Sequence, residues 1–216
     1  HGGGPQIDSQ LLKVDIERNF VDGIRVTDKK TIEVVSNTLN NIVNKDIVDL
    51  INTNGGNAIG IAKSKNSSIK VKKYVSSKVD YGFVGEIINI DTNYIYELMN
   101  SNYIPVIAPL GYDENNNIYN INADSAASAI ASQLSAEKII FLTDQTGVLN
   151  NQKELISSLN LGEIKKLTKE NVITGGMLPK IEACSNAINN NVKMAHIVDG
   201  RIQHSVLLEI FTNEGI

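Results

Sequence analysis

Three glycine-bearing loops and a nearby lysine are the residues in this sequence whose types and spacing could do chemistry. Gly2–Gly4, Gly55–Gly56 and Gly175–Gly176 each lie beside an expected helix, where backbone N–H groups can approach an oxyanion. Lys180 follows the last loop and could neutralise charge on a transferring phosphoryl group. The alternative is structural: glycine often only ends a helix or turns the chain, and Lys180 could be a solvated surface charge.

A second polar group, Asn120, Asn122 and Asp124, precedes a stretch rich in alanine and serine. An aspartate at a junction between a strand and a helix could organise cationic groups or a metal. It could equally be an acid that favours the positive end of the helix dipole. His196 lies on an apolar strand, where a structural histidine is the commoner outcome. Three histidines without ligand spacing and one cysteine argue against a zinc site.

Composition and missing motifs exclude several classes of protein. No loop fits G-x-G-x-x-G or G-x-x-x-x-G-K-[ST], so neither a Rossmann dinucleotide site nor a Walker loop is supported. The 216 residues include 20 Lys and Arg against 24 Asp and Glu. The resulting charge of −4 argues against a broad basic face for nucleic acid. No apolar run reaches membrane-spanning length, and a single cysteine, Cys184, excludes an intrachain disulfide framework.

Elements that could position these residues alternate between helices and strands. Hydrophobic spacing and turn signals predict helices near residues 7–14, 27–55, 91–100, 122–131, 165–171 and 177–189. They predict strands near residues 58–62, 69–75, 84–90, 104–110, 138–143 and 192–198. Thr27 is the expected N-cap of the long second helix, and Ile104–Leu110 reads as one strand buried on both faces. Alternation with short links indicates an α/β protein with a largely parallel sheet.

Four segments carry a resemblance to a known family: His1-Gly-Gly-Gly-Pro5, Gly23-Ile-Arg-Val-Thr27, Asn120-Ile-Asn-Ala-Asp124 and Gly175-Gly-Met-Leu-Pro-Lys180. In order and spacing they resemble the acetylglutamate kinases of the amino acid kinase family, over essentially all 216 residues. The Gly-Ile-Arg-Val-Thr segment separates this group from carbamate kinases and aspartokinases. The implied fold is a three-layer αβα sandwich with a mainly parallel open central sheet.

The resemblance also implies a reaction and a division into lobes. ATP with Mg²⁺ would phosphorylate the γ-carboxylate of N-acetyl-L-glutamate, the second step of arginine biosynthesis. Residues 1–135 would bind acetylglutamate, and residues 136–216 would bind ATP and an arginine effector. Lys180 would stabilise the transferring phosphoryl group, and Asp124 would orient the catalytic lysines.

The binding residues follow from the same resemblance. Arg25 would grip the α-carboxylate of the substrate, a task suited to a planar guanidinium. The implied substrate-binding residues are Gly3, Gly4, Arg25, Asn120 and Asn122. The implied nucleotide-binding residues are Asp144, Thr146, Gly147, Val148, Leu149, Val172, Ile173 and Thr174. We expect no metal ligand from the protein, because Mg²⁺ would be held through the nucleotide.

Regulation is a further implication. His196, Glu209 and Gly215 resemble the effector site of arginine-inhibited members, and a carboxylate at Glu209 could pair with the cationic groups of arginine. Such members are homo-oligomers, hexameric when complete, and a nitrogen-status signal protein is a possible partner. We expect no nucleic acid or membrane partner, and a location in the cytoplasm, or in the plastid stroma for a plastid-encoded chain.

The ends of the sequence and two alternative functions complete the expectations. In the family, a strand and a lysine-glycine loop precede the position of His1, and Gly-Thr follows that of Ile216. We therefore expect the sequence to be clipped at both ends. A non-catalytic arginine-sensing homologue is one alternative, which the absent lysine would permit. Another amino acid kinase, of the carbamate or aspartate class, is the second.

Overall fold

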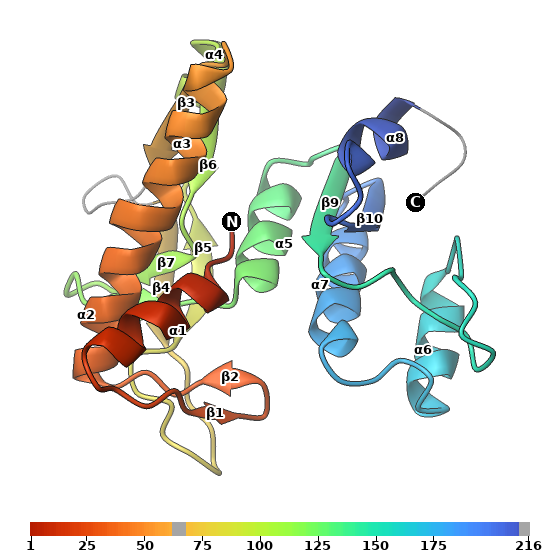
Figure 1. Ribbon diagram of the computed structural model, residues 1–216, viewed down its shortest axis with the longest axis horizontal. Coiled ribbons are helices and arrows are strands. Elements are labelled where there is room, and N and C mark those ends of the chain that lie inside the picture. The colour runs from red at the N-terminus through yellow and green to blue at the C-terminus, as the bar shows by residue number, and fades with distance from the viewer. Residues whose placement is uncertain (62–67, 212–216) are drawn as a thin grey trace. The chain divides into compact units, whose positions relative to one another are not determined.

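The computed structural model describes residues 1–61 and 68–211 of the chain, which form two compact units. Unit 1 comprises His1–Ala126 and unit 2 comprises Ala127–Ile216 (Figure 1). The division expected from the sequence lay after residue 135, so helix α5 (Ala123–Gln133) contains most of the difference between the two boundaries.

Unit 1 contains four α-helices, one π-helical segment and eight short strands in its described residues. Its helices are α1 (Gly4–Lys13), α2 (Lys29–Asn37), the π-helix η1 (Thr38–Val43), α3 (Asn44–Thr53) and α4 (Asn93–Asn100). Its strands are β1 (Phe20–Val21), β2 (Ile24–Arg25), β3 (Ala58–Ile61), β4 (Ile69–Lys73), β5 (Gly85–Ile90), β6 (Ile104–Ile107), β7 (Leu110–Tyr112) and β8 (Ile118–Asn120).

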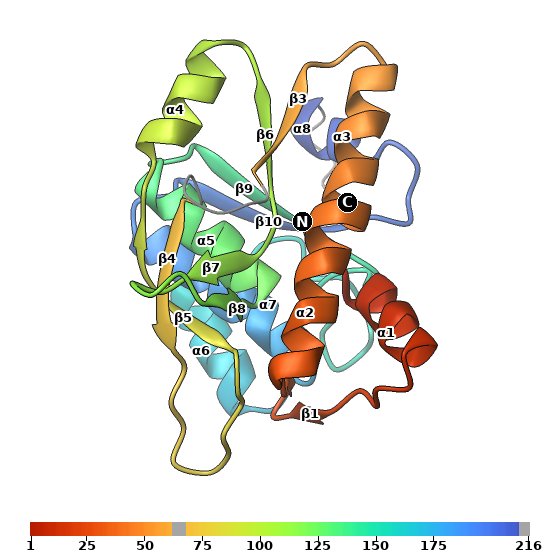
Figure 2. The same cartoon turned by 90° about the vertical axis from the view of Figure 1, so that its left-hand side faces the viewer.

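The predicted long helix is present as the uninterrupted run α2, η1 and α3, seen as one column in Figure 2. Its N-cap is Asp28, whose side chain accepts a hydrogen bond of 2.7 Å from the Thr31 N–H. The expectation that Thr27 is the cap was wrong. Thr27 is fully buried, and its hydroxyl donates to the Arg25 carbonyl oxygen at 2.9 Å.

Parallel and antiparallel pairings build the sheets of unit 1. Strands β3 and β6 pair in parallel, and β4 pairs antiparallel with β5 and in parallel with β7. The prediction of a single strand over Ile104–Leu110 was wrong, because the segment forms parts of two strands, β6 and β7, which belong to different sheets. Pro109 lacks an N–H for a ladder, and the chain turns there with the Leu110 N–H bonded to the Ala108 carbonyl oxygen at 2.8 Å.

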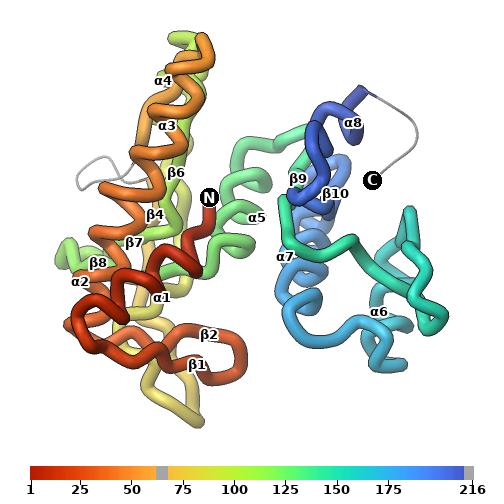
Figure 3. Tube along the Cα trace, viewed as in Figure 1, coloured from red at the N-terminus to blue at the C-terminus, as the bar shows by residue number. Residues whose placement is uncertain are grey.

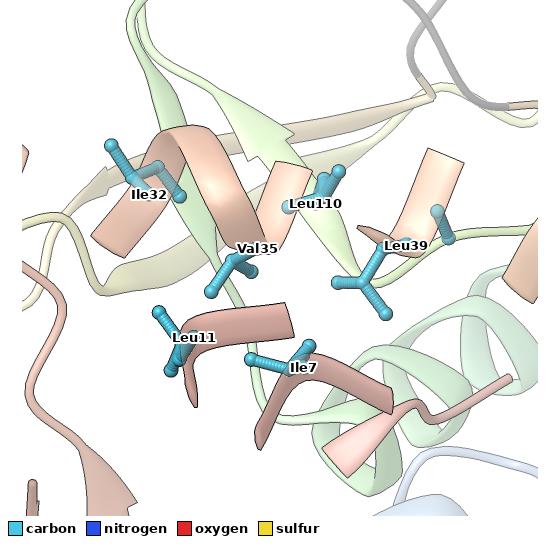
Figure 4. Packing of buried hydrophobic residues seen from close by; sticks show 7 residues of the cluster. Ile7, Leu11, Ile32, Val35, Leu39 and Leu110 are labelled. Carbon is cyan, nitrogen blue, oxygen red and sulfur yellow. The ribbon is translucent and has the colours of Figure 1, made fainter. Parts of the chain in front are cut away.

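The core of unit 1 lies between the helices and strand β7 (Figure 4). Ile7 and Leu11 project from α1 onto Val35 and Leu39, with Leu110 of β7 beside them. The i, i+4 spacing of both helical pairs places each pair on one helix face. This packing fixes α1, and therefore the glycine loop at its start, to the long helix.

Unit 2 is a parallel strand pair with helices, and its path is followed most easily in Figure 3. Its elements are β9 (Lys138–Thr143), α6 (Leu161–Lys169), α7 (Met177–Asn189), β10 (Met194–Asp199) and α8 (Ser205–Phe211). Strands β9 and β10 pair in parallel from Lys138 to Thr143. Helix α6 begins before the predicted residue 165, because Asn160 and Glu163 form a capping box at its start.

Small residues allow α7 to pack closely in unit 2. Ala183, Cys184 and Ala187 lie in one cluster with Ile139 and Phe141 of β9. Cys184 is 7% exposed. The Ser128 hydroxyl on α5 donates a buried hydrogen bond of 2.9 Å to the Ala183 carbonyl oxygen, which ties the second half of α5 to α7.

The α/β class and the mainly parallel pairing of the core strands confirm the predicted fold class. Within residues 1–61 and 68–211, no helix combines the length and the apolar character needed to span a membrane.

Candidate active site

The glycine loop of unit 1 leads directly into helix α1. Gly3 is the N-cap, and no side chain caps the first turn. The first N–H groups of a helix have no partner within it and carry the positive end of the dipole. A Cβ on Gly3 would lie 2.7 Å from Leu39 Cδ2, whereas Gly2 and Gly4 face open space. Gly3 is thus required by packing, and Gly4 leaves its backbone approachable.

His1 fastens this loop to the rest of unit 1. The Asn44 amide donates to His1 Nε2 at 3.1 Å and to the Val106 carbonyl oxygen at 2.9 Å. With Nε2 accepting, the Nδ1–H of the ring donates to the Gly2 carbonyl oxygen at 2.8 Å. Asn44 is buried, so the loop is held by a desolvated amide instead of by a mobile surface group.

Arg25 is a buried cation near the same helix. It is 7% exposed, and its Nη2 donates a 2.6 Å hydrogen bond to Asp8 Oδ1. The Phe20 ring lies under the guanidinium, with 4.5 Å from Cζ to the ring centroid. Nη1 is buried and has no hydrogen-bond partner among the described residues. Asp8 lies four residues after Gly4, about 6 Å along the helix axis, so its bond to Arg25 ties the guanidinium to the helix that the glycine loop begins.

Asn120, Asn122 and Asp124 surround the junction between β8 and α5. The Asn120 N–H donates to the Phe83 carbonyl oxygen at 2.9 Å. Asn122 caps α5, because its Oδ1 accepts from the Ser125 N–H at 2.9 Å. Asp124 is in the first turn of α5, close enough to the backbone nitrogen of His1 for an electrostatic interaction. Unit 1 therefore brings Asp124 to the glycine loop.

In unit 2, charged side chains gather where β9 and β10 end. Asp144 follows β9, and Asp199 ends β10 in a bidentate pair with Arg201, with N–O distances of 2.9 and 2.7 Å. Hydrogen bonds from Arg201 lower the pKa of Asp199 to about 2. The carboxyl edge of a parallel sheet is where open α/β folds bind ligands.

The predicted nucleotide-binding residues fall into two kinds. The side chains of Val148 and Ile173 belong to the core of unit 2, so only their backbone could serve a ligand. Asp144, Thr146 and Thr174 are exposed. Leu149 is exposed as well, and Gly147 and Val172 are half-buried.

Lys180 lies in the first turn of α7, four residues after the N-cap Gly176. Gly175 has φ of +57°, a conformation that glycine adopts without strain. A Cβ on either glycine would meet nothing within 4 Å. The Met177 and Leu178 N–H groups bond to the Thr174 and Gly175 carbonyl oxygens at 3.3 and 3.2 Å. What suits an anionic phosphate at the start of α7 is therefore the unhindered glycine backbone together with the cation.

His196 and Glu209 meet in unit 2, through a hydrogen bond between His196 Nδ1 and Glu209 Oε1. Both line a cavity of about 850 Å³, with Cys184, Asn160, Lys193 and Ile181 among its other walls. Nε2 of His196 is buried and has no hydrogen-bond partner among the described residues. The third predicted effector residue, Gly215, lies outside the described residues.

No group of three or more His, Cys, Asp and Glu residues within the described part of the chain could hold a metal ion.

Sequence reasoning missed Asp8 and Phe20, the two neighbours of Arg25. The one available signal was spacing, because Asp8 lies a helical turn after Gly4. An aspartate on a short amphipathic helix is ordinarily a solvated residue, and nothing in the sequence connects it to a strand that lies beyond a turn.

Comparison with known proteins identifies the family. Residues 1–199 match the amino acid kinase family. A protein of Campylobacter hominis named acetylglutamate kinase is 49% identical over 216 residues, covering 100% of this chain and 76% of its own. The crystal structure of smu.665 from Streptococcus mutans UA159 gives a TM-score of 0.84 at 29% identity, covering 91% of this chain and 79% of that one. The structure of a Giardia carbamate kinase gives 0.62 at 19% identity, covering 95% and 78%, and shows the fold alone.

A family match over residues 1–199 and a relative that is 49% identical along the whole chain lead to one conclusion: the chain belongs to the amino acid kinase family and is a kinase.

Proposed function

We propose that this kinase transfers the γ-phosphoryl group of ATP to the γ-carboxylate of N-acetyl-L-glutamate, the second step of arginine biosynthesis. The relative from Campylobacter hominis carries the name of that activity. The chain also has the residue types that an acidic substrate and a phosphoryl group require: the cations Arg25 and Lys180, and the glycine loops Gly2–Gly4 and Gly175–Gly176.

The observation that carries the proposal is the state of Arg25. A guanidinium that is 7% exposed leaves Nη1 without a partner in the described residues. A buried charged donor without an acceptor is costly, and a bound carboxylate would satisfy it. Acetylglutamate has such a group in its α-carboxylate. Carbamate has no second carboxylate to offer, which favours the acetylglutamate reaction over the carbamate one.

The residues of the chain would divide the work of the transfer. The carboxylate oxygen of acetylglutamate attacks the γ-phosphorus, the bond to the β–γ bridging oxygen breaks, and ADP leaves with that electron pair. Lys180, which follows the unhindered glycine backbone at the start of α7, would stabilise the charge that develops. Asp124 would orient cationic groups, and Mg²⁺, when bound with the nucleotide, would neutralise phosphate charge.

The test is ADP release by the chain with N-acetyl-L-glutamate, carbamate, L-aspartate or L-glutamate as acceptor. An acyl phosphate forms a hydroxamate with hydroxylamine, so trapping identifies the phosphorylated carboxylate. Turnover with N-acetyl-L-glutamate at more than about 10²-fold over the other acceptors supports the proposal. Preference for carbamate or aspartate would contradict it, and arginine binding without any turnover would favour the non-catalytic homologue.

Feedback by L-arginine is the second part of the proposal. It is supported by the His196–Glu209 pair and by the cavity that both line. The Glu209 carboxylate can accept from a guanidinium or an α-ammonium group. Inhibition requires two conformations that differ in arginine affinity, with a typical coupling of about 1–3 kcal/mol. An arginine titration of activity, with calorimetric binding alongside, tests it.

A further inference from the structure

The Arg25 guanidinium is held by Asp8, which is not itself a proposed substrate contact. Asp8 projects from α1, and its side chain is 28% exposed. Its Oδ1 accepts from Arg25 Nη2 at 2.6 Å, and its Oδ2 accepts from Arg18 Nη1 at 3.3 Å. Arg25 therefore receives a single carboxylate oxygen, because the second oxygen of Asp8 is turned to Arg18.

This geometry restrains the guanidinium without consuming both of its terminal amino groups. A bidentate partner would occupy two N–H groups of the fork. The single contact with Asp8 leaves Nη1 without a partner, and the Phe20 ring under Cζ restricts rotation of the plane. A long side chain that is held in one rotamer loses less entropy when a ligand binds.

We propose that Asp8 is a positioning residue, which fixes the Arg25 guanidinium in the orientation that binds the α-carboxylate of the substrate. The inference rests on the proposed function, since it requires that Arg25 binds that carboxylate. It predicts that Asp8 affects acetylglutamate binding although it does not contact the ligand.

Asp8→Ala is the first variant to measure, with KM and kcat obtained separately for each substrate. We expect KM for acetylglutamate to rise about ten- to a hundredfold, the range for a misplaced positioning group. KM for ATP should stay within about twofold, because loss of a contact in one site removes binding of that ligand alone. A purely structural role would lower the active fraction and so reduce kcat, with both KM values unchanged.

Asp8→Asn and a control on the surface show whether loss of the bond to Arg25 causes the rise in KM for acetylglutamate. The amide of Asp8→Asn still offers Oδ1 to Nη2, so its KM for acetylglutamate should lie between those of the wild type and Asp8→Ala. The same variant keeps the measurement possible where Asp8→Ala folds poorly. Asp49→Ala is the matched control, because it also removes a carboxylate from a cation pair, with Lys45 on the exposed face of α3.

A double-mutant cycle with Arg25→Lys separates this proposal from the function on which it rests. If Asp8 acts through Arg25, Asp8→Ala should raise KM little further in the Arg25→Lys background. Additive effects, or an unchanged KM for acetylglutamate in both Asp8 variants, would overturn the positioning role while the function stands. An unchanged KM in Arg25→Lys itself would instead refute the carboxylate site of the proposed function.

Discussion

Arg25→Lys is the substitution whose effect can be worked out most fully from the structure. Lysine keeps the charge but replaces a planar fork with a point charge on a flexible stem. In the wild type, the guanidinium bonds to Asp8 through Nη2, and its buried Nη1 has no hydrogen-bond partner among the described residues. A single ammonium group has all its donors on one atom, so it cannot bond to Asp8 and to the substrate carboxylate with the geometry of the guanidinium. The stacking over Phe20 is lost as well.

The size of the effect follows from the number of contacts removed. One charged hydrogen bond to the substrate contributes about 1.5–3 kcal/mol, and Arg25 is 7% exposed, so solvent screens that bond little. Since about 1.4 kcal/mol corresponds to a factor of ten, KM for acetylglutamate should rise roughly 10- to 150-fold. ATP binding should change little, because Arg25 belongs to unit 1 and the predicted nucleotide loops belong to unit 2.

Steady-state kinetics with each substrate varied at saturation of the other provides the assay. Circular dichroism of the variant checks that the fold persists. A rise in KM for ATP with KM for acetylglutamate unchanged would show that Arg25 serves the nucleotide, and would reverse the assignment of the two units.

Asp124→Asn should lower kcat by about 10²–10³-fold while KM for acetylglutamate changes far less, because the charge that orients catalytic cations is removed; near-normal turnover in a stopped assay would exclude Asp124 from the mechanism. Glu209→Ala should weaken L-arginine binding at least about tenfold by calorimetry, and equal affinity in both proteins would contradict the effector site. The pKa of Asp199 is lowered to about 2, so its ion pair with Arg201 stabilises the fold above about pH 4 and loses that effect as pH falls towards about 2. The Tm of Asp199→Asn should therefore depend less on pH in this range than the Tm of the wild type, and the same pH dependence of Tm in both proteins would contradict the role of the pair. Gly3→Ala should destabilise unit 1 by about 1–3 kcal/mol, since its Cβ would overpack Leu39, and denaturant unfolding should show no such loss for Gly4→Ala, which has open space.

Elements with one dominant local signal were predicted from the sequence to within a residue or two. Strand β9 and helix α7 have the predicted bounds, because an apolar run and a glycine-bounded small-residue helix leave little ambiguity. The break between β6 and β7 was missed because the apolar pattern continues through Ala108–Pro109, and only the pairing partners reveal two sheets. The π-helical segment η1 has no periodic signature, since its widened turn forms within an otherwise helical pattern.

The candidate site shows the same division between local and long-range information. The positions of the Gly2–Gly4 and Gly175–Gly176 loops and of Lys180 beside helix starts could be predicted, because glycine and helix signals are local in the sequence. Their roles in binding and catalysis stay predictions. The capping role of Asn122 also follows from its place before α5, although the residue was expected to bind substrate. The contact between Asp8 and Arg25 could not be predicted, because it forms only when Arg25, seventeen positions away, folds back onto α1.

The burial of Cys184 means that the reactivity of its thiol reports the opening of unit 2. It is the one cysteine in the sequence, and its side chain packs with Ala183 and Ala187 in the core of unit 2. A thiol reagent can reach this sulfur only when that core, or the cavity beside it, opens. The rate of thiol labelling therefore times the opening of unit 2 without a signal from unit 1, and no engineered probe is needed. A ligand that fills the cavity would lower the rate of Cys184 labelling, so the rate measured against ligand concentration gives the fraction of cavities that are occupied.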